Sequence, residues 1–271
     1  MGGLASEPVV DTSRVTGSAK IRTWAALVTV TAVLAGSAVG GVPAGAAAPP
    51  LPERLAHVGD SRQVIVVTSA NWSTSYARLQ TWQLRADGTW VPVMRGVPAR
   101  LGWSGFAREK NRLQNTGKTP AGTFALPRGF GLDKPKSVDL RYRKIDNNDW
   151  WPYDPQDPKT YNVMQFRRPP QARWRTDWAE HLRSYTKQYR YSVVLDYNLP
   201  SGIKWRNGQR IATDTANTSK GGGIFLHVNG SGATAGCVSV SRERMRRILR
   251  WLNPEHDPVI VMGPGDVIER M

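Results

Sequence analysis

The chain has 271 residues with 37 lysine and arginine against 21 aspartate and glutamate residues, which gives a formal net charge of +16. A charge this positive suits an anionic partner, either nucleic acid or an anionic polymer of a cell envelope, or else a solvated basic surface without a specific partner. The arginines are scattered and no nucleic-acid-binding motif accompanies them, so we expect no nucleic-acid partner.

The first element in chain order is an export signal over residues 1–48. A polar start ends in Lys20 and Arg22, an apolar run follows over 24–39, and small residues over 44–48 fit a cleavage site. An uncleaved membrane anchor is the alternative, although the apolar run falls short of the roughly 20 residues that span a bilayer. We therefore expect export to the cell envelope, periplasm or extracellular wall, and one domain over 49–271.

Residues 49–271 indicate a mainly β domain. The segment Asp87-Gly88 between two apolar stretches is a strong hairpin signal. Residues 130–175 are rich in Pro, Asp, Asn and Trp, and we expect long surface loops whose aromatic side chains pack on the domain. The expected strands are 63–68, 78–84, 89–94, 123–126, 191–196, 223–228, 237–240 and 259–262.

One helix is predicted after residue 240. Ser241 is a suitable N-cap and Glu243 favours the first turn. Met245, Ile248, Leu249 and Leu252 repeat at the spacing of one helix face, with arginines on the other faces, before Asn253-Pro254 ends the helix. The helix starts shortly after Cys237, so we expect it to support the strand that carries the cysteine.

Cys237 is the chain's one cysteine, and it follows His227 across a short glycine-rich loop. A free cysteine is most often a small buried apolar residue. A neighbouring imidazole, however, is the commonest means of making a thiolate nucleophile, and the loop is short enough to place the two residues on neighbouring strands. Gly236 leaves the backbone open, so its N–H and that of Cys237 are candidates for an oxyanion hole. The other histidines show no metal-ligand spacing, and we expect neither a metal nor another cofactor.

These residues resemble the YkuD-type L,D-transpeptidases of bacterial cell walls. The matching pieces are Leu226-His227-Val228, then Thr234-Ala235-Gly236-Cys237-Val238, and upstream the run from Lys118-Thr119-Pro120 to Gly122-Thr123-Phe124. The resemblance covers about 60–264 and implies a mixed β-sandwich or partly open barrel with one amphipathic helix after the cysteine strand. The family's usual box is Ser/Thr-His-Gly-Cys with Arg or Asn two residues after the cysteine. Ala235 and Ser239 stand in those places, as in a divergent Thr-Ala-Gly-Cys branch, so recognition of the substrate's peptide end is unassigned.

The resemblance implies acyl transfer between peptidoglycan stem peptides, with Cys237 as nucleophile and His227 as general base and acid. The backbone carbonyl of Val228 or Asn229 would orient the imidazole. Thr234, Asn229, Tyr161 and Asn198 are weaker candidates for lining the substrate cleft, and for Tyr161 and Asn198 a supporting structural role is the favoured reading. We expect a monomer whose partners are stem peptides and, given the charge, anionic envelope polymers.

Two other functions remain open at this point. Water in place of an amine as acceptor would make the protein an L,D-carboxypeptidase or endopeptidase, and a catalytically silent basic wall-binding protein would keep the fold with an unreactive cysteine. An active enzyme would also be expected to have a thiol that alkylates quickly near neutral pH and depends on His227.

Overall fold

The computed structural model describes residues 48–271. The predicted export signal lies outside the described residues. Within the described part, no helix is long and apolar enough to cross a bilayer. The two α-helices of this part are α1 (Leu51–Arg54) and α2 (Arg242–Trp251). Short 3-10 helices cover Glu109–Asn111, Thr176–Trp178, Leu182–Ser184, Gln188–Arg190, Pro254–His256 and Ile268–Arg270.

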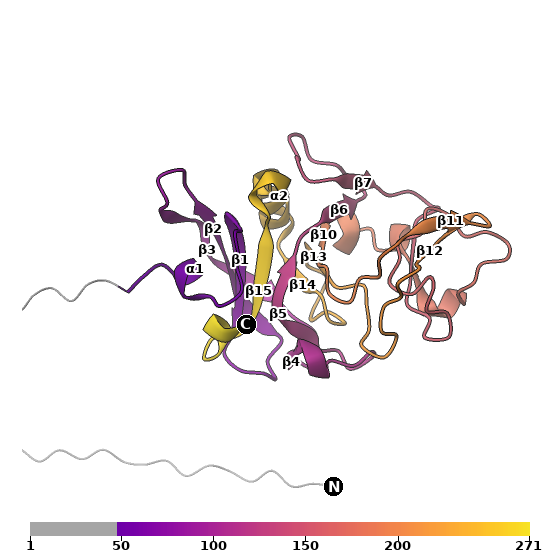
Figure 1. The fold of residues 1–271 in the computed structure, drawn as a ribbon, viewed down its shortest axis with the longest axis horizontal. Coiled ribbons are helices and arrows are strands. Elements are labelled where there is room, and N and C mark those ends of the chain that lie inside the picture. Colours follow the sequence, from indigo (N-terminus) through magenta and orange to yellow (C-terminus); the bar gives the residue numbers. More distant parts are fainter. Residues whose placement is uncertain (1–47) are drawn as a thin grey trace, which may run out of the picture. The chain divides into compact units, whose positions relative to one another are not determined.

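Strands dominate the described residues, as the sequence predicts (Figure 1). They are β1 (Gln63–Ser69), β2 (Tyr76–Leu84), β3 (Trp90–Arg100), β4 (Phe106–Arg108), β5 (Thr119–Ala125), β6 (Arg128–Gly131), β7 (Tyr142–Lys144), β8 (Trp150–Pro152), β9 (Ala179–His181), β10 (Ser192–Val194), β11 (Lys204–Arg206), β12 (Gln209–Ile211), β13 (Phe225–Val228), β14 (Val238–Val240) and β15 (Val259–Pro264).

Most of these strands join one large mixed sheet, in the order β4-β5-β15-β1-β2-β3-β14-β13-β10-β6-β7. The pairs β1/β15, β13/β14, β4/β5 and β6/β7 are parallel, and the other neighbours are antiparallel. The last strand, β15, therefore lies inside the sheet, between β5 and β1. The mainly β class is confirmed, with a single large sheet as its frame.

Every strand expected from the sequence is present with shifted ends. The hairpin between β2 and β3 turns at Gly88, whose φ of +80° is a conformation that glycine adopts readily. The short strands β4, β6 to β9, β11 and β12 were not predicted. At three or four residues each they are too short to show an alternating pattern, and their positions depend on the strands that they pair with.

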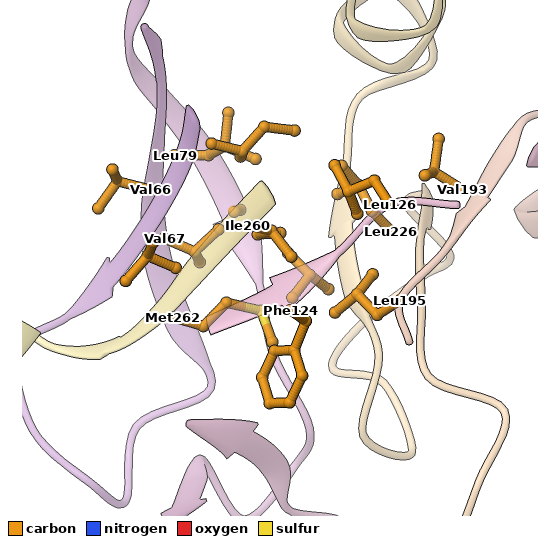
Figure 2. Close-up of a cluster of buried hydrophobic side chains, with 14 of the residues drawn as sticks. Val66, Val67, Leu79, Phe124, Leu126, Val193, Leu195, Leu226, Ile260 and Met262 are labelled. Atoms are coloured by element: carbon orange, nitrogen blue, oxygen red, sulfur yellow. The ribbon is translucent and has the colours of Figure 1, made fainter. Parts of the chain in front are cut away.

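The larger hydrophobic cluster lies along β1, β2, β5, β13 and β15 (Figure 2). Val66, Ile260 and Leu226 within it are completely buried. In β1 the residues from Gln63 to Val67 are all buried, so both faces of this strand are covered. This explains why β1 is continuously apolar instead of alternating.

Helix α2 forms as predicted. The Ser241 hydroxyl accepts a hydrogen bond from the Arg244 N–H at 3.4 Å, which caps the helix. Met245, Ile248 and Leu249 are fully buried in the larger cluster, while most of the arginines are exposed. The helix connects β14 to β15 and packs against β13, the strand that carries His227 and pairs with β14.

A second hydrophobic cluster forms where residues 130–175 pack on the sheet. Trp151 is 1% exposed, and its ring lies 4.7 Å from that of Phe225 and 6.1 Å from that of Phe130. Cys237 belongs to this cluster. The aromatic side chains of this loop-rich segment thus cover the face of the sheet that carries the cysteine.

Candidate active site

Strands β13 and β14 bring His227 and Cys237 to neighbouring positions. The strands pair in parallel, with Leu226 opposite Val238 and His227 opposite Ser239. Leu226, Val228, Val238 and Val240 lie in the larger cluster, whereas Phe225 and Cys237 lie in the second cluster. Since side chains alternate between the two faces of a strand, His227 shares the face of Phe225. The histidine and the thiol therefore lie on the same side of the sheet.

Thr234 shapes the turn that leads into Cys237. Its backbone is tied to the end of β3, because its N–H donates to the Leu101 carbonyl and its carbonyl accepts from the Trp103 N–H, both at 2.9 Å. Its hydroxyl donates to the Cys237 carbonyl at 2.6 Å and accepts from the Gly236 N–H at 3.1 Å. The Gly236 N–H is thus engaged, and a role in an oxyanion hole would require that bond to shift. The Cys237 N–H is then the better candidate.

Position 236 requires glycine for two reasons. Its φ is +145°, a conformation that side chains disfavour. A Cβ there would also lie 2.9 Å from Arg112 Nη2 and 3.0 Å from the Lys118 carbonyl oxygen. Gly236 therefore lets the Arg112 guanidinium approach the backbone next to the cysteine.

The Cys237 thiol is buried and held by two backbone groups. Sγ donates to the Gly223 carbonyl at 3.3 Å and accepts from the Phe225 N–H at 3.4 Å. Burial first, and the Glu180 carboxylate second, raise the pKa of the thiol to about 12, against the smaller lowering effects of the Phe225 N–H and the Arg112 charge. This shift works against the expected fast alkylation at neutral pH, because the resting thiol holds its proton.

His227 is oriented by its own strand. Its Nδ1 lies 2.8 Å from the Val228 carbonyl oxygen. A carbonyl only accepts, so Nδ1 carries the proton and Nε2 has a free lone pair. Burial lowers the pKa of His227 to about 4, despite the opposing effect of this hydrogen bond. At neutral pH both the imidazole and the thiol are therefore uncharged.

A cleft of about 140 Å³ opens at the thiol. Its walls come from segments far apart in the chain. The residues that line it are Trp103, Arg112, Gln114, Asn115, Tyr153, Glu180, Gly221, Gly222, Gly223, Ile224, Ala235, Gly236 and Cys237. Of the aromatic residues, Trp103 is 57% exposed and offers a stacking surface at this cleft.

Glu180 is a cleft residue that sequence reasoning missed. It lies in β9 and accepts a hydrogen bond from the Tyr189 hydroxyl. Burial raises the pKa of Glu180 to about 7, although this hydrogen bond lowers it. The Tyr189 ring meets the His227 ring edge to face at 5.7 Å. Glu180 and Tyr189 thus connect the cleft wall to both members of the Cys-His pair.

Arg112 is the second missed residue, a cation that is only 4% exposed. Its Nε donates to the Lys118 carbonyl at 2.8 Å, its Nη1 donates to the Lys220 carbonyl, and its charge lies 5.3 Å from the centre of the Tyr197 ring. Within residues 48–271 it forms no ion pair with a carboxylate. A buried guanidinium held this way has hydrogen-bond partners but no carboxylate in direct contact.

The run from Gly221 to Gly223 makes room for these groups. A Cβ at Gly221 would lie 2.0 Å from Arg112 Nη1, and a Cβ at Gly222 would collide with the Asn162 side chain. The Asn162 side chain accepts from the Gly223 N–H and from Trp151 Nε1, both at 2.8 Å. The glycine run therefore fixes the Gly223 carbonyl that meets the thiol.

The weaker sequence candidates lie behind the cleft. The Tyr161 hydroxyl donates to the cleft residue Gln114 at 2.6 Å, and Asn198 Nδ2 donates to the Gly221 carbonyl at 2.7 Å. The Asn229 N–H donates to the Val240 carbonyl at 2.8 Å. None of these three, nor Thr234, is among the residues that line the cleft. Their contacts are those of residues that hold cleft walls in place.

Position 239, where the resemblance expects Arg or Asn, does not open into the cleft. Ser239 is fully buried, and its hydroxyl has no hydrogen-bond partner. The cation nearest to Cys237 along the cleft walls comes instead from Arg112. Within residues 48–271, no three His, Cys, Asp or Glu side chains group as metal ligands would.

Comparison with known proteins gives one match. The family model YkuD, described as the L,D-transpeptidase catalytic domain, matches residues 74–261. This range contains β13, β14, α2 and every residue that lines the cleft. No curated protein and no solved structure matches the chain.

Proposed function

Because this chain belongs to the YkuD family of L,D-transpeptidase catalytic domains, a family that acts on peptidoglycan stem peptides, we propose that it cross-links such peptides through a Cys237 thioester. The observation that carries the proposal is the placement of Cys237 at the cleft with His227 behind it on the same face of the sheet. The thiol opens into the cleft, and the imidazole on the same face has its Nδ1 bound to the Val228 carbonyl. That hydrogen bond leaves Nε2 as the proton acceptor.

In the first step Cys237 attacks the carbonyl of the diamino acid's L-centre in a donor tetrapeptide. The thiol proton moves to His227 Nε2 as the S–C bond forms, because the resting pair is neutral and a free thiolate is disfavoured. The developing oxyanion is stabilised by backbone N–H groups, with Cys237 N–H as the main candidate. His227 then returns the proton to the departing amine, and D-alanine leaves.

The second step releases the acyl group to an acceptor. An amine of a second stem peptide attacks the thioester, His227 takes the amine proton, and the thiol is restored with that proton. The products are an amide cross-link and free enzyme. Water as acceptor gives a shortened stem by the same proton movements, and this hydrolytic reaction is the alternative function.

Arg112 supplies the positive charge for binding the substrate's peptide end, a role that Ser239 cannot fill. The D-alanine carboxylate of the donor lies about one residue length, roughly 3.8 Å, beyond the carbonyl that the thiol attacks. Arg112 Nη2 faces Gly236, the residue before Cys237. A guanidinium held by two backbone carbonyls and lacking an acidic partner suits that carboxylate. We assign Arg112 to binding the donor's free peptide end.

The test is intact-mass spectrometry of the protein after incubation with a disaccharide-tetrapeptide and, separately, with a carbapenem, to which the family's chemistry is susceptible. Wild type should gain a covalent adduct and release D-alanine from the stem. Cys237→Ser should gain none, and His227→Ala should react far more slowly. His256→Ala, at a histidine in the 3-10 helix Pro254–His256 whose ring meets the Gln83 side chain, is the matched control and should behave as wild type.

The products distinguish the alternatives. Adding an acceptor stem should give a cross-linked dimer, whereas a shortened stem as the sole product would mean hydrolysis. A folded wild type that gains no adduct from either compound would contradict the enzyme proposal and favour a silent wall-binding protein.

A further inference from the structure

A second cavity, of about 390 Å³, lies away from the Cys-His cleft. It is lined from β6, β7, β10 and β12 and by the segment that contains Phe166, and it shares no lining residue with the cleft. Small-molecule sites in proteins start at about this size. The cavity is therefore large enough for a small organic ligand.

Five cationic side chains converge on this cavity. They are Arg128, Arg141, Arg143, Lys144 and Arg210, and no aspartate or glutamate is among the lining residues. Arg143 alone of the five forms an ion pair in residues 48–271, at 2.7 Å to Asp149. Like charges gathered in one concavity repel one another, and the lining residues give this cavity an excess of positive charge.

Besides the ion pair of Arg143 with Asp149, the arginines are positioned by contacts that carry no negative charge. The Phe166 ring has the Arg143 guanidinium at 4.0 Å on it and the Arg210 guanidinium at 4.6 Å. Arg210 Nη1 also donates to the Met164 carbonyl at 2.6 Å. Cation-π contacts and carbonyls fix the direction of a guanidinium but leave its charge available to a ligand. The cluster is thus organised before any anion arrives.

The pKa values of two arginines in the cluster are lowered, as burial and the crowding of positive charge would cause. Burial, followed by the positive charges of Arg128, Arg141 and Arg143, lowers the pKa of Arg210 to about 10. Burial and the charge of Arg141 also lower the pKa of Arg128. Both side chains remain charged at neutral pH, and an anion between them would relieve the repulsion.

We propose that this cavity binds a phosphate group of a phosphodiester-linked sugar or polyol polymer. A tetrahedral phosphate presents acceptor oxygens in several directions and so uses several guanidinium groups at once, whereas one carboxylate is satisfied by a single arginine fork. The Trp205 ring, 57% exposed, lies 6.1 Å from the Phe166 ring and offers a flat face to a neighbouring sugar or polyol unit. The site would hold the protein on an anionic polymer while the cleft remains free.

The first experiment titrates the full protein with glycerol 3-phosphate, with inorganic phosphate and with acetate, by calorimetry at fixed ionic strength. Glycerol 3-phosphate should bind, and acetate should not. Arg141→Gln/Arg210→Gln should weaken binding at least tenfold. The charge-matched control is Arg246→Gln/Arg250→Gln, on the exposed side of α2, and it should stay within twofold of wild type.

Folding is checked in the same series. Arg210→Lys keeps the charge but loses the planar fork, so it should retain the melting temperature of wild type and still bind less tightly. Equal losses in the cavity variant and the α2 control would overturn the proposal, because they would show attraction to net charge alone. Equal binding of acetate would overturn the choice of phosphate.

The second experiment asks which phosphate source is bound. Poly(glycerol phosphate) beads should retain wild type and the α2 control but release the cavity variant at lower salt, whereas polyglutamate beads of similar charge should not separate the three proteins. Vesicles rich in phosphatidylglycerol form the rival arm. Preferential binding to vesicles, lost in the cavity variant, would overturn the polymer proposal in favour of a lipid headgroup.

Discussion

Glu180 and Arg112 bring opposite charges to the cleft that holds Cys237, and they act in opposite directions on its thiol. The carboxylate raises the pKa of Cys237, and the guanidinium lowers it. Since both effects are weaker than burial, the thiol stays protonated until a substrate is present. Each of these two residues can be tested separately.

Glu180→Gln should make Cys237 alkylate several-fold faster with iodoacetamide at pH 8.5. Removing the negative charge lowers the thiol pKa and increases the thiolate fraction. Burial raises the pKa of Glu180 to about 7, so the wild-type carboxyl is mostly protonated at pH 5.5 and the two proteins should react alike there. A rate ratio that does not change between these two pH values would contradict the prediction. Glu255→Gln, on the surface, is the control.

Arg112→Gln should lower kcat/KM for a tetrapeptide with a free terminal carboxylate by about 10- to 100-fold, the worth of a charged hydrogen bond. For the same tetrapeptide with a terminal carboxamide, the substitution should lower kcat/KM only slightly, because the uncharged carboxamide forms no ion pair with Arg112. In a stem whose diamino acid carries a side-chain carboxyl, amidating that carboxyl instead should leave the effect of the variant on kcat/KM intact.

The kcat/KM of Arg112→Lys should lie between the values of wild type and Arg112→Gln, since lysine keeps the charge but lacks the planar pair of N–H donors of arginine. Lys110→Gln makes the same charge change at an exposed position and should have no effect. Equal losses of activity on the acid and the amide would mean that Arg112 supports the loops only.

The sequence predicts Cys237 and His227 as the candidate reacting pair, but it does not predict Arg112 and Glu180 beside the thiol. Cys237 and His227 stand close together in the chain, within a recognisable motif, and the register of two strands completes their placement. Arg112 and Glu180 come from separate segments without a local pattern. The arginine that follows the polar turn Glu109–Asn111 gives no sign that it will be buried, because its burial depends on glycines at 221 and 236.

At the scale of elements, length decides what the sequence reveals. Helix α2, the β2/β3 hairpin and β1 contain enough residues for periodicity or turn chemistry to be visible. The strands β6 and β7 and the hairpin β11/β12 are three or four residues long, and tertiary pairing fixes them. These unpredicted strands include three of the four that line the basic cavity, so the cavity also could not be predicted.

Asn162 links the long loop after β8 to the glycine run, and its removal should loosen both. Its side chain forms four hydrogen bonds, and its φ of +59° would strain most other residues. Asn162→Gly accepts this φ and loses only the side-chain contacts. We expect a loss of about 2–4 kcal/mol in unfolding free energy, measured by urea denaturation, because buried partners are left unsatisfied.

The acylation rate of Asn162→Gly should fall as well, since the Gly223 carbonyl that meets the thiol loses its anchor. Asn148→Gly, at an exposed asparagine, is the matched control for the loss of side chain. A change in stability below about 0.5 kcal/mol would show that the glycine run does not depend on Asn162.

At the scale of the whole molecule, the cleft couples stability to pH through two groups of opposite sign. The pKa of Glu180 rises from 4.5 to about 7 on folding, so the native state binds the extra proton and stability falls as pH increases from 4.5 to 7. The pKa of His227 falls from 6.5 to about 4, so the unfolded state binds the extra proton and stability rises between pH 4 and 6.5. In wild type the two trends oppose each other.

Single variants should therefore separate the two trends. Relative to wild type, Glu180→Gln should become more stable as pH increases from 4.5 to 7, and His227→Gln should become less stable as pH increases from 4 to 6.5. Urea unfolding at pH 4.5, 5.5, 6.5 and 7.5 measures both differences. Parallel stability curves for wild type and either variant would show that the group concerned does not change its proton affinity on folding.

The position of β15 between β5 and β1 makes the sheet depend on a segment that follows the Cys237 motif in the chain. A chain that stops before Val259 already contains the cysteine, the histidine and every wall of the cleft, yet its sheet is divided into two parts with open edges. Closure awaits a contact between distant parts of the sequence, which is an intrinsically slow event. A chain interrupted before β15 therefore holds the chemical groups of the cleft without the framework that aligns them.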